Sequence, residues 1–180
     1  MRAVSSPKSQ ILALSCHAAT PTEVVRKLEV HIAFRASGAL DLRYVLAAQM
    51  DRVRVLPRRA AARRDELWKH TCFEAFFAEH GNGAYRELNF APSSEWAMYS
   101  FDGYRQGMAA PETPAPNIRV ERDAQQLTLE ASVQPGFAAV NRLALAAVIE
   151  DENGRLSYWA LRHPPGKPDF HHPGSFQTLP

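Results

Sequence analysis

Apolar and polar residues alternate along most of this chain with the period of two that is typical of β-strands. In residues 28–34 and 40–46 every second residue is apolar, which predicts a hairpin that turns at Ser37-Gly38. Residues 143–149 are apolar on both parities and predict a strand covered on both faces, or a short buried helix. Further strands are predicted over residues 11–16, 51–57, 118–121, 127–133 and 156–161.

About ten short strands with turn residues between them and little helix predict an all-β fold: an antiparallel two-sheet β-sandwich of the jelly-roll or immunoglobulin-like kind. A closed barrel is the alternative. The length of 180 residues suits one domain over residues 1–180, with tails at 1–9 and about 172–180. Residues 58–66 are either a helix or a flexible loop, and residues 135–140 are predicted to form one helical turn.

Polar chemistry is densest in residues 67–105, which we predict to form three consecutive strands. Glu74 alternates with apolar neighbours in the first strand and is expected to point away from the core. Glu87 and Asn89 share the polar side of the second strand. A turn at Gly81-Asn82-Gly83 predicts antiparallel pairing of these strands, so the three polar side chains are expected on one sheet face.

The third strand, residues 95–101, contains Trp96 and leads to Tyr104 and Arg105. Carboxylates, an amide, an arginine and aromatic rings are what a site for a hydroxyl-rich ligand needs, and such a site binds without catalysing a reaction. An exposed sheet face with solvated Glu and Asn side chains accounts for the pattern equally well. The proline-rich residues 107–117 predict a long surface loop and a candidate rim for the site.

The amino-acid composition limits the classes of partner that the protein is expected to bind. The net charge is +2, from 21 Lys and Arg against 19 Asp and Glu, so no basic field argues for nucleic acid or an anionic membrane. The two cysteines, Cys16 and Cys72, are too few for a disulfide framework. Neither a secretory segment nor an apolar run of membrane-spanning length is evident, so a cytoplasmic protein is expected.

Sequence motifs for nucleotide binding or a serine nucleophile are absent. Glu74 and Glu87 are candidates for the paired carboxylates of a glycosidase, although binding is the favoured interpretation. Near the C-terminus, Lys167 and Asp169 are candidates to join the ligand site. Asp169 and His171 also provide two of the ligands that a zinc site needs, but an ordered segment packed over the sandwich, with its histidines capping or exposed, is favoured.

Trp68 is followed six residues later by Glu74 in LWKHTCFEAFF, and the text YRELNFAPSSEWAMYSFDGYR comes next. With these residues the chain resembles the DOMON-like superfamily of β-sandwich ligand-binding domains, close to family 9 carbohydrate-binding modules. The resemblance covers roughly residues 28–162 as an order of strands and residues 67–105 as motif-like text.

The resemblance implies a groove on one sheet face that binds sugar or haem. In the sugar binders, aromatic rings sandwich the terminal saccharide while Glu, Asn and Arg bind its hydroxyls. Haem-binding members use Met and His, for which Met98 with His70 or His163 are candidates. A straight strand separates Trp68 from Glu74 by about 20 Å, so Trp68 must belong to a turn that curls back over the sheet.

The expected ligand is therefore a small carbohydrate or polyol, with haem as the alternative and no resident cofactor or metal. The predicted ligand-binding residues are Trp68, Glu74, Glu87, Asn89, Trp96, Tyr104, Arg105, Lys167 and Asp169.

Overall fold

The computed structural model describes residues 9–35, 37–79, 83–134, 136 and 140–179. Within these residues the chain is all-β, with eleven strands and two single-turn 3-10 helices. Most of the predicted turn at 81–83 and of the predicted helical turn at 135–140 lies outside the described residues. The elements are β1 (Ser9–Cys16), β2 (Val25–Phe34), β3 (Leu40–Ala48), η1 (Leu67–Lys69), β4 (Cys72–Ala78), β5 (Tyr85–Phe90), β6 (Trp96–Phe101), β7 (Asn117–Arg122), β8 (Gln126–Val133), β9 (Arg142–Glu150), β10 (Leu156–Ala160), η2 (Pro173–Ser175) and β11 (Gln177–Thr178).

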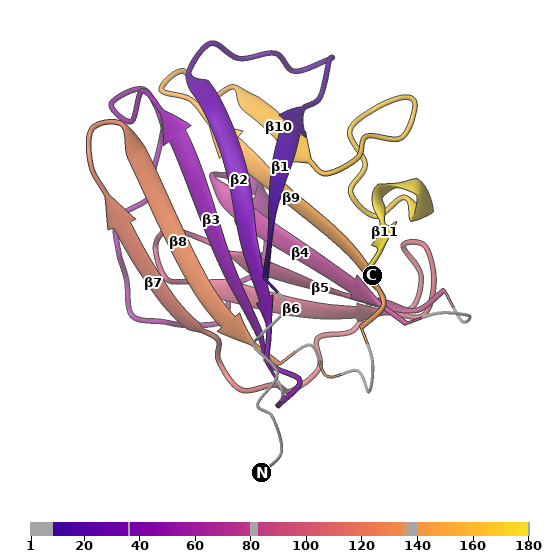
Figure 1. Cartoon of the computed structure of the whole chain (residues 1–180). Coiled ribbons are helices and arrows are strands. Elements are labelled where there is room, and N and C mark those ends of the chain that lie inside the picture. Colours follow the sequence, from indigo (N-terminus) through magenta and orange to yellow (C-terminus); the bar gives the residue numbers. More distant parts are fainter. Residues whose placement is uncertain (1–8, 36, 80–82, 135, 137–139, 180) are drawn as a thin grey trace.

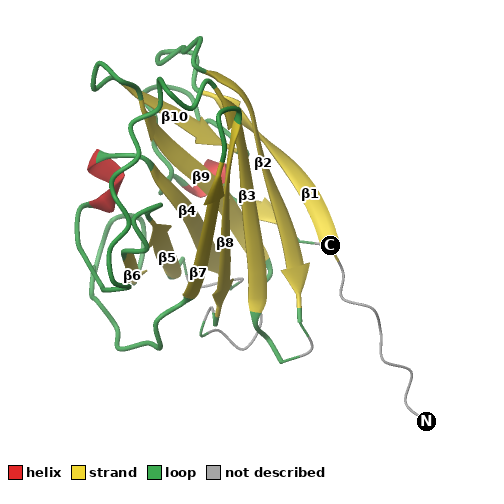
Figure 2. Ribbon diagram, turned by 90° about the vertical axis from the view of Figure 1, so that its left-hand side faces the viewer, coloured by secondary structure: helices red, strands yellow, loops and turns green. Residues whose placement is uncertain are grey.

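The strands form one antiparallel sheet that curls back on itself, as Figures 1 and 2 show. Its strand order is β6-β5-β4-β9-β10-β1-β2-β3-β8-β7, with β11 added to β9. Strand β1 joins the two halves, because residues 9–14 pair with β2 while Ser15 and Cys16 pair with β10. The two separate sheets of a sandwich are therefore not confirmed, and the strand path does not close into a barrel.

The main hydrophobic core lies between the two halves of the curled sheet. The predicted hairpin of residues 28–34 and 40–46 is confirmed as β2–β3, and it supplies one side of this core. Tyr44 of β3 is fully buried, stacks at a tilt against Phe73 of β4 and donates a hydrogen bond of 2.8 Å to the carbonyl oxygen of Glu74. The inner face of β4 is thereby tied to the opposite half of the sheet.

The half of the sheet that contains β4, β5, β6 and β9 is covered on its outer face as well. A second, smaller apolar cluster lies there, to which Phe170 and Phe176 of the C-terminal segment contribute. Strand β9 accordingly buries Leu143 and Leu145 on the inner side and Ala144 and Ala146 on the outer side, which confirms the predicted strand with two covered faces.

Two local predictions need correction, and two others are made more precise. Leu67–Lys69 do not begin a strand but form η1, because Glu66 adopts a left-handed conformation (φ 64°) and the carbonyl of Leu67 accepts a hydrogen bond from His70. Residues 51–57 contribute only an isolated bridge at Val53 and are not a strand. Residues 58–66 form a loop. Residues 172–179, predicted as a tail, form η2 and β11 and pack on the sheet (yellow in Figure 1).

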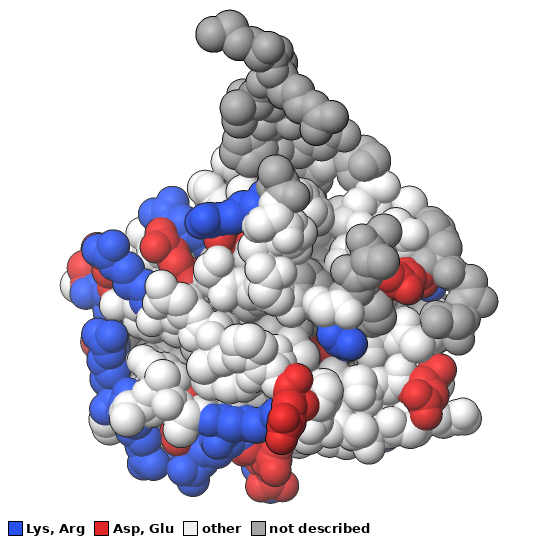
Figure 3. Space-filling view, turned by 90° about the horizontal axis from the view of Figure 1, so that it is seen from below, with Lys and Arg blue, Asp and Glu red and all other residues white. Residues whose placement is uncertain are grey.

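Charged side chains are unevenly distributed over the surface. Seen from below in Figure 3, Lys and Arg gather on the side where β7 and β8 lie in Figure 1, interspersed with acidic residues, while the middle of this face is uncharged. Ion pairs such as Arg43–Glu130 and Arg119–Glu121 neutralise part of this border. Among the residues that the structure describes, none belongs to a helix long and apolar enough to cross a membrane.

Candidate functional site

The register of three neighbouring strands gathers polar side chains on the outer face of the sheet. Glu74 of β4 lies opposite Asn89 of β5, and Glu87 lies opposite Tyr99 of β6. The prediction that Glu74, Glu87 and Asn89 share one face is confirmed. Their side chains are not solvated, because the three residues are only 3%, 4% and 0% exposed, so the alternative of an open polar sheet face is wrong.

A pocket of about 410 Å³ opens above these carboxylates. Strands β4, β5, β6, β9 and β10 form its floor, and its walls come from η1, from the loop after β6 and from the C-terminal segment. Its lining residues are Trp68, Glu74, Glu87, Tyr99, Phe101, Arg105, Met108, Val148, Tyr158, Pro168, Phe170 and His171.

Aromatic rings make up much of the wall. Trp68, which is 36% exposed, meets Tyr99 edge to face with 6.1 Å between ring centroids. Tyr158 and Phe170 meet at 5.9 Å on another part of the lining. Rings of this kind offer flat apolar faces to the C–H side of a sugar ring.

The two carboxylates of the floor are held in an environment that disfavours their charge. The pKa of Glu74 is raised well above its usual value, chiefly by burial and also by the charge of neighbouring Glu87, while the positive charge of Arg105 acts to lower it. Burial likewise raises the pKa of Glu87 to about 7, although a hydrogen bond of 2.8 Å from the Asn89 amide and the charge of Arg105 work against it. Glu74 Oε1 is buried and has no hydrogen-bond partner within the described structure. The floor is therefore able to donate hydrogen bonds as well as accept them.

Arg105 is positioned by the segments around it. Its backbone is left-handed (φ 54°), and its N–H donates to the Tyr85 hydroxyl at 3.3 Å. Its guanidinium donates to Asp169 Oδ1 at 2.8 Å, and the Tyr104 hydroxyl donates to the other oxygen of Asp169. Burial raises the pKa of Asp169, but the hydrogen bonds from Tyr104 and Arg105 outweigh burial and the pKa is lowered. Asp169 thus acts as a charged anchor for the loop that carries Arg105.

His171 lies between the floor and the C-terminal segment. The Tyr85 hydroxyl accepts from the Arg105 N–H and therefore has its own proton free for His171 Nδ1, 2.7 Å away. The ring proton of neutral His171 is then on Nε2, which faces Glu87 Oε2 at 3.6 Å. Burial and the nearby Arg105 lower the pKa of His171 to about 4, so the imidazole is uncharged at neutral pH.

The structure distributes the sequence-predicted residues over three places. Trp68, Glu74, Glu87 and Arg105 line the pocket, with Trp68 carried on the short helix η1 beside the sheet. Asn89, Tyr104 and Asp169 lie behind the lining and hold Glu87 or Arg105 in place. Lys167 is exposed and outside the pocket lining.

Trp96 does not belong to the pocket, contrary to the prediction. The β5–β6 register places Trp96 opposite Phe90, so its side chain shares the inner face of the sheet with the main core, where it is 5% exposed. The Arg63 guanidinium covers it with a cation–π contact of 5.5 Å. Trp96 is a structural residue.

Several residues that line the pocket were not predicted from the sequence. Tyr99 and Phe101 share the parity opposite to Trp96, and knowledge of the β5–β6 register would have identified them. Met108 belongs to the loop that the prolines predicted as a rim. Phe170 and His171 belong to the C-terminal segment that was expected to pack over the fold, but this segment has no periodicity to indicate which of its side chains enter the pocket.

The geometry gives little support to haem or a metal ion, the alternative ligands considered from the sequence. Met98 lies on the inner face of β6, whereas His70 bonds to Glu150 and His163 to the carbonyl of Ser15, so these residues do not face one common space. Asp169 is occupied by Tyr104 and Arg105. No group of three or more potential metal ligands occurs in the described part of the chain.

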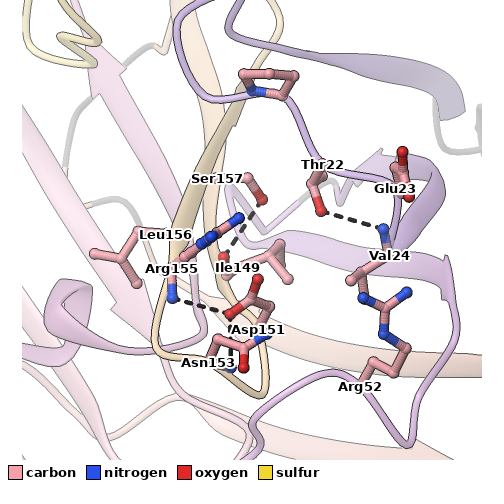
Figure 4. Close-up of a pocket in the computed structure, with 11 residues that line it drawn as sticks. Thr22, Glu23, Val24, Arg52, Ile149, Asp151, Asn153, Arg155, Leu156 and Ser157 are labelled. Carbon is pink, nitrogen blue, oxygen red and sulfur yellow. Dashed lines mark hydrogen bonds between the residues drawn. The ribbon is translucent and has the colours of Figure 1, made fainter.

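A second pocket of about 410 Å³ lies beside the β9–β10 hairpin (Figure 4). Several of its polar groups are already paired: Asp151 accepts from the backbone N–H of Asn153 and Arg155, and Thr22 accepts from Val24. No aromatic residue lines it. This pocket therefore lacks both the buried unpaired acceptor and the ring faces of the site on β4 and β5.

Comparison with known proteins identifies solved structures that have a similar fold. No protein-family model and no curated protein sequence matches the chain. Among solved structures, it is similar to a candidate carbohydrate-binding protein from Bacteroides uniformis, with a TM-score of 0.65 and 14% identity over 96% of this chain and 85% of that one. It is also similar to a family 9 carbohydrate-binding module from Caldicellulosiruptor kristjanssonii solved with cellotriose, with a TM-score of 0.52 and 10% identity over 87% of this chain and 74% of that one. The expected likeness to family 9 carbohydrate-binding modules is thus confirmed for the fold.

Proposed function

We propose that this protein binds a small carbohydrate or similar polyol, without chemical turnover, in the pocket above Glu74 and Glu87. The observation that carries the proposal is the pairing of aromatic walls with buried, incompletely satisfied carboxylates in one cavity of about 410 Å³. The solved structures of similar fold that are named as carbohydrate-binding proteins add independent support.

The chemistry of the pocket suits a hydroxyl-rich ring. Sugar hydroxyls are both donors and acceptors, and Glu74 and Glu87 suit either partner because burial raises the pKa of both carboxyls and so favours their protonated forms. Arg105 supplies donors at the same level. A ligand that occupies these groups also relieves the cost of the unpaired Glu74 oxygen, about 1–3 kcal/mol.

The arrangement of the two carboxylates favours binding over hydrolysis. Glu74 and Glu87 rise from neighbouring strands of the same sheet face, in diagonal positions. A glycoside hydrolase needs its two carboxyl groups on either side of the scissile bond. Turnover of a panel of aryl glycosides, assayed with and without chelator, would contradict this part of the proposal.

The first experiment is a thermal-shift screen of the whole protein over mono- and disaccharides, with haem included. A sugar present at 100 times its Kd is expected to add about 2.7 kcal/mol of stability, which is a rise in Tm of about 5–10 °C for a domain of this size. If haem alone shifts Tm and gives a Soret band, the haem alternative replaces the proposal. If no saccharide shifts Tm, the proposal is wrong.

Calorimetric titration of a variant then locates the site. Trp68→Ala removes one stacking surface worth about 1–2 kcal/mol and is expected to raise the Kd for the sugar about 5- to 30-fold. Ile11→Ala is the matched control, because Ile11 is also an exposed apolar residue, 63% exposed, but lies on β1 away from the pocket lining. Unchanged affinity in Trp68→Ala would show that the sugar binds elsewhere.

A further inference from the structure

The pocket contains more carboxylates than cations. Glu74 and Glu87 line it and Asp169 lies directly behind it, whereas Arg105 is the one Lys or Arg among its lining residues in the described structure. Arg105 already forms an ion pair with Asp169 at 2.8 Å, so its positive charge is balanced by that carboxylate. His171 is uncharged near neutral pH because its pKa is lowered to about 4, chiefly by burial. The two floor carboxylates therefore have no cation of their own within the described residues.

Glu74 is the group that points to a ligand. It lines the pocket, is 3% exposed, and its Oε1 has no hydrogen-bond partner in the described structure. The charged or titratable groups that act on it are Glu87 from β5, Arg105 from the loop after β6, Tyr44 from β3 on the opposite half of the sheet, and Cys72 from its own strand. Of these, only Arg105 attracts its negative charge, and Arg105 is shared with Asp169.

The walls add a second feature that suits a cation. Trp68, Tyr99, Phe101, Tyr158 and Phe170 all line the pocket. The π-face of an aromatic ring attracts a positive group within about 6 Å, more strongly as the group is desolvated. Carboxylates beneath an aromatic wall are a suitable environment for an ammonium group.

We propose that the ligand is a polyhydroxylated molecule that carries a protonated amine, of which an amino sugar is the simplest example, and that its ammonium binds Glu74. This inference rests on the proposed function and specifies its ligand class. The ammonium donates to the carboxylate of Glu74, which lines the pocket, while the ring hydroxyls use Glu87 and Arg105. Burial raises the pKa of Glu74, and a bound ammonium favours its charged carboxylate, so binding of the ammonium is expected to release a proton from Glu74 to solvent, whereas binding of a neutral sugar releases none.

The test is isothermal titration calorimetry of the whole protein with D-glucosamine, D-glucose and N-acetyl-D-glucosamine, slightly below neutral pH. Glucosamine is expected to bind at least about tenfold more tightly than the other two, equivalent to about 1.4 kcal/mol. Repetition in two buffers of different ionisation enthalpy is expected to show proton release for glucosamine alone. Equal or weaker binding of glucosamine than of glucose would overturn the inference and leave sugar binding intact.

Variants assign the effect to one carboxylate. Glu74→Gln keeps size and acceptor but loses the charge, so its preference for glucosamine is expected to fall below about threefold. Glu121→Gln is the matched control, since Glu121 is an exposed carboxylate of β7 that pairs with Arg119. If Glu74→Gln still prefers glucosamine, the assignment of the ammonium to Glu74 is wrong. If that variant fails to fold, the unaltered protein decides: glucosamine binding without proton release also overturns the assignment. Silence of all three sugars overturns the inference, while the wider saccharide screen separately decides the proposed function.

Discussion

Relative to the unaltered chain, the Glu87→Gln variant is expected to gain free energy of unfolding as the pH rises from acidic to neutral. Burial raises the pKa of Glu87 in the folded protein from its ordinary value of 4.5 to about 7. Between these values the folded state keeps a proton that the unfolded state has lost, so the free energy of unfolding falls as pH rises through this window. Glutamine does not titrate, and the variant does not lose this contribution.

The magnitude follows from the width of the window. An interval of roughly 2.5 pH units at about 1.36 kcal/mol per unit gives a relative gain of about 3 kcal/mol for the variant between about pH 5 and pH 8. Glu87 is 4% exposed, so solvent screening reduces this value little. The amide of glutamine still offers an oxygen to Asn89, which donates to Glu87 at 2.8 Å, so the local hydrogen bond is retained.

Urea denaturation at several pH values measures the effect. The midpoint of Glu87→Gln is expected to move above that of the unaltered protein as pH rises, with an unchanged m-value. Glu121→Gln, which removes an exposed carboxylate, is expected to follow the unaltered protein. If the difference in unfolding free energy between Glu87→Gln and the unaltered protein is constant over the whole pH range, burial does not raise the pKa of Glu87.

Three further substitutions test the assignment of roles. Trp96→Ala is expected to cost about 3–5 kcal/mol of stability because Trp96 lies in the core, whereas Trp68→Ala costs less than about 1 kcal/mol; equal urea midpoints would contradict this division. Asp169→Asn removes the charged partner of Arg105 and is expected to weaken sugar binding roughly tenfold in calorimetry, while unaltered affinity would show that the anchor is dispensable. Gly107→Ala is expected to open the loop after β6 to limited proteolysis, because Gly107 has φ 62° and an added Cβ would collide with the Asp102 side chain; an unchanged cleavage pattern refutes it.

The alternation of side chains was sufficient to predict most strands and the polar face. The period of two places Glu74 opposite in direction to Phe73 whatever the sheet topology is, and the same holds for Glu87 and Leu88. The β2–β3 and β7–β8 hairpins follow from short connections between alternating runs. These features depend only on neighbours along the chain, which is why a single sequence reveals them.

Features that depend on distant parts of the chain were not predictable in this way. Trp96 was assigned to the wrong face because the connection between β5 and β6 sets which parity of β6 shares a face with Glu87. The continuity of the sheet rests on two residues at the end of β1 that pair with β10, about 145 positions away. The covering of the pocket by Phe170 and His171 depends on packing of an aperiodic segment.

The strands beneath the pocket serve two purposes at once, and this limits how recognition in such a protein can change. Each residue of β4 that faces the carboxylates is flanked by one that fills the interior, and the main-chain oxygen of Glu74 is itself held by Tyr44 from the far half of the sheet. A substitution that moved the floor would disturb the interior as well. Trp68 and Met108 lie on exposed connections outside the strands and are free of this constraint. Selection or engineering for a new ligand is therefore expected to alter these two positions first and to leave the floor as it is.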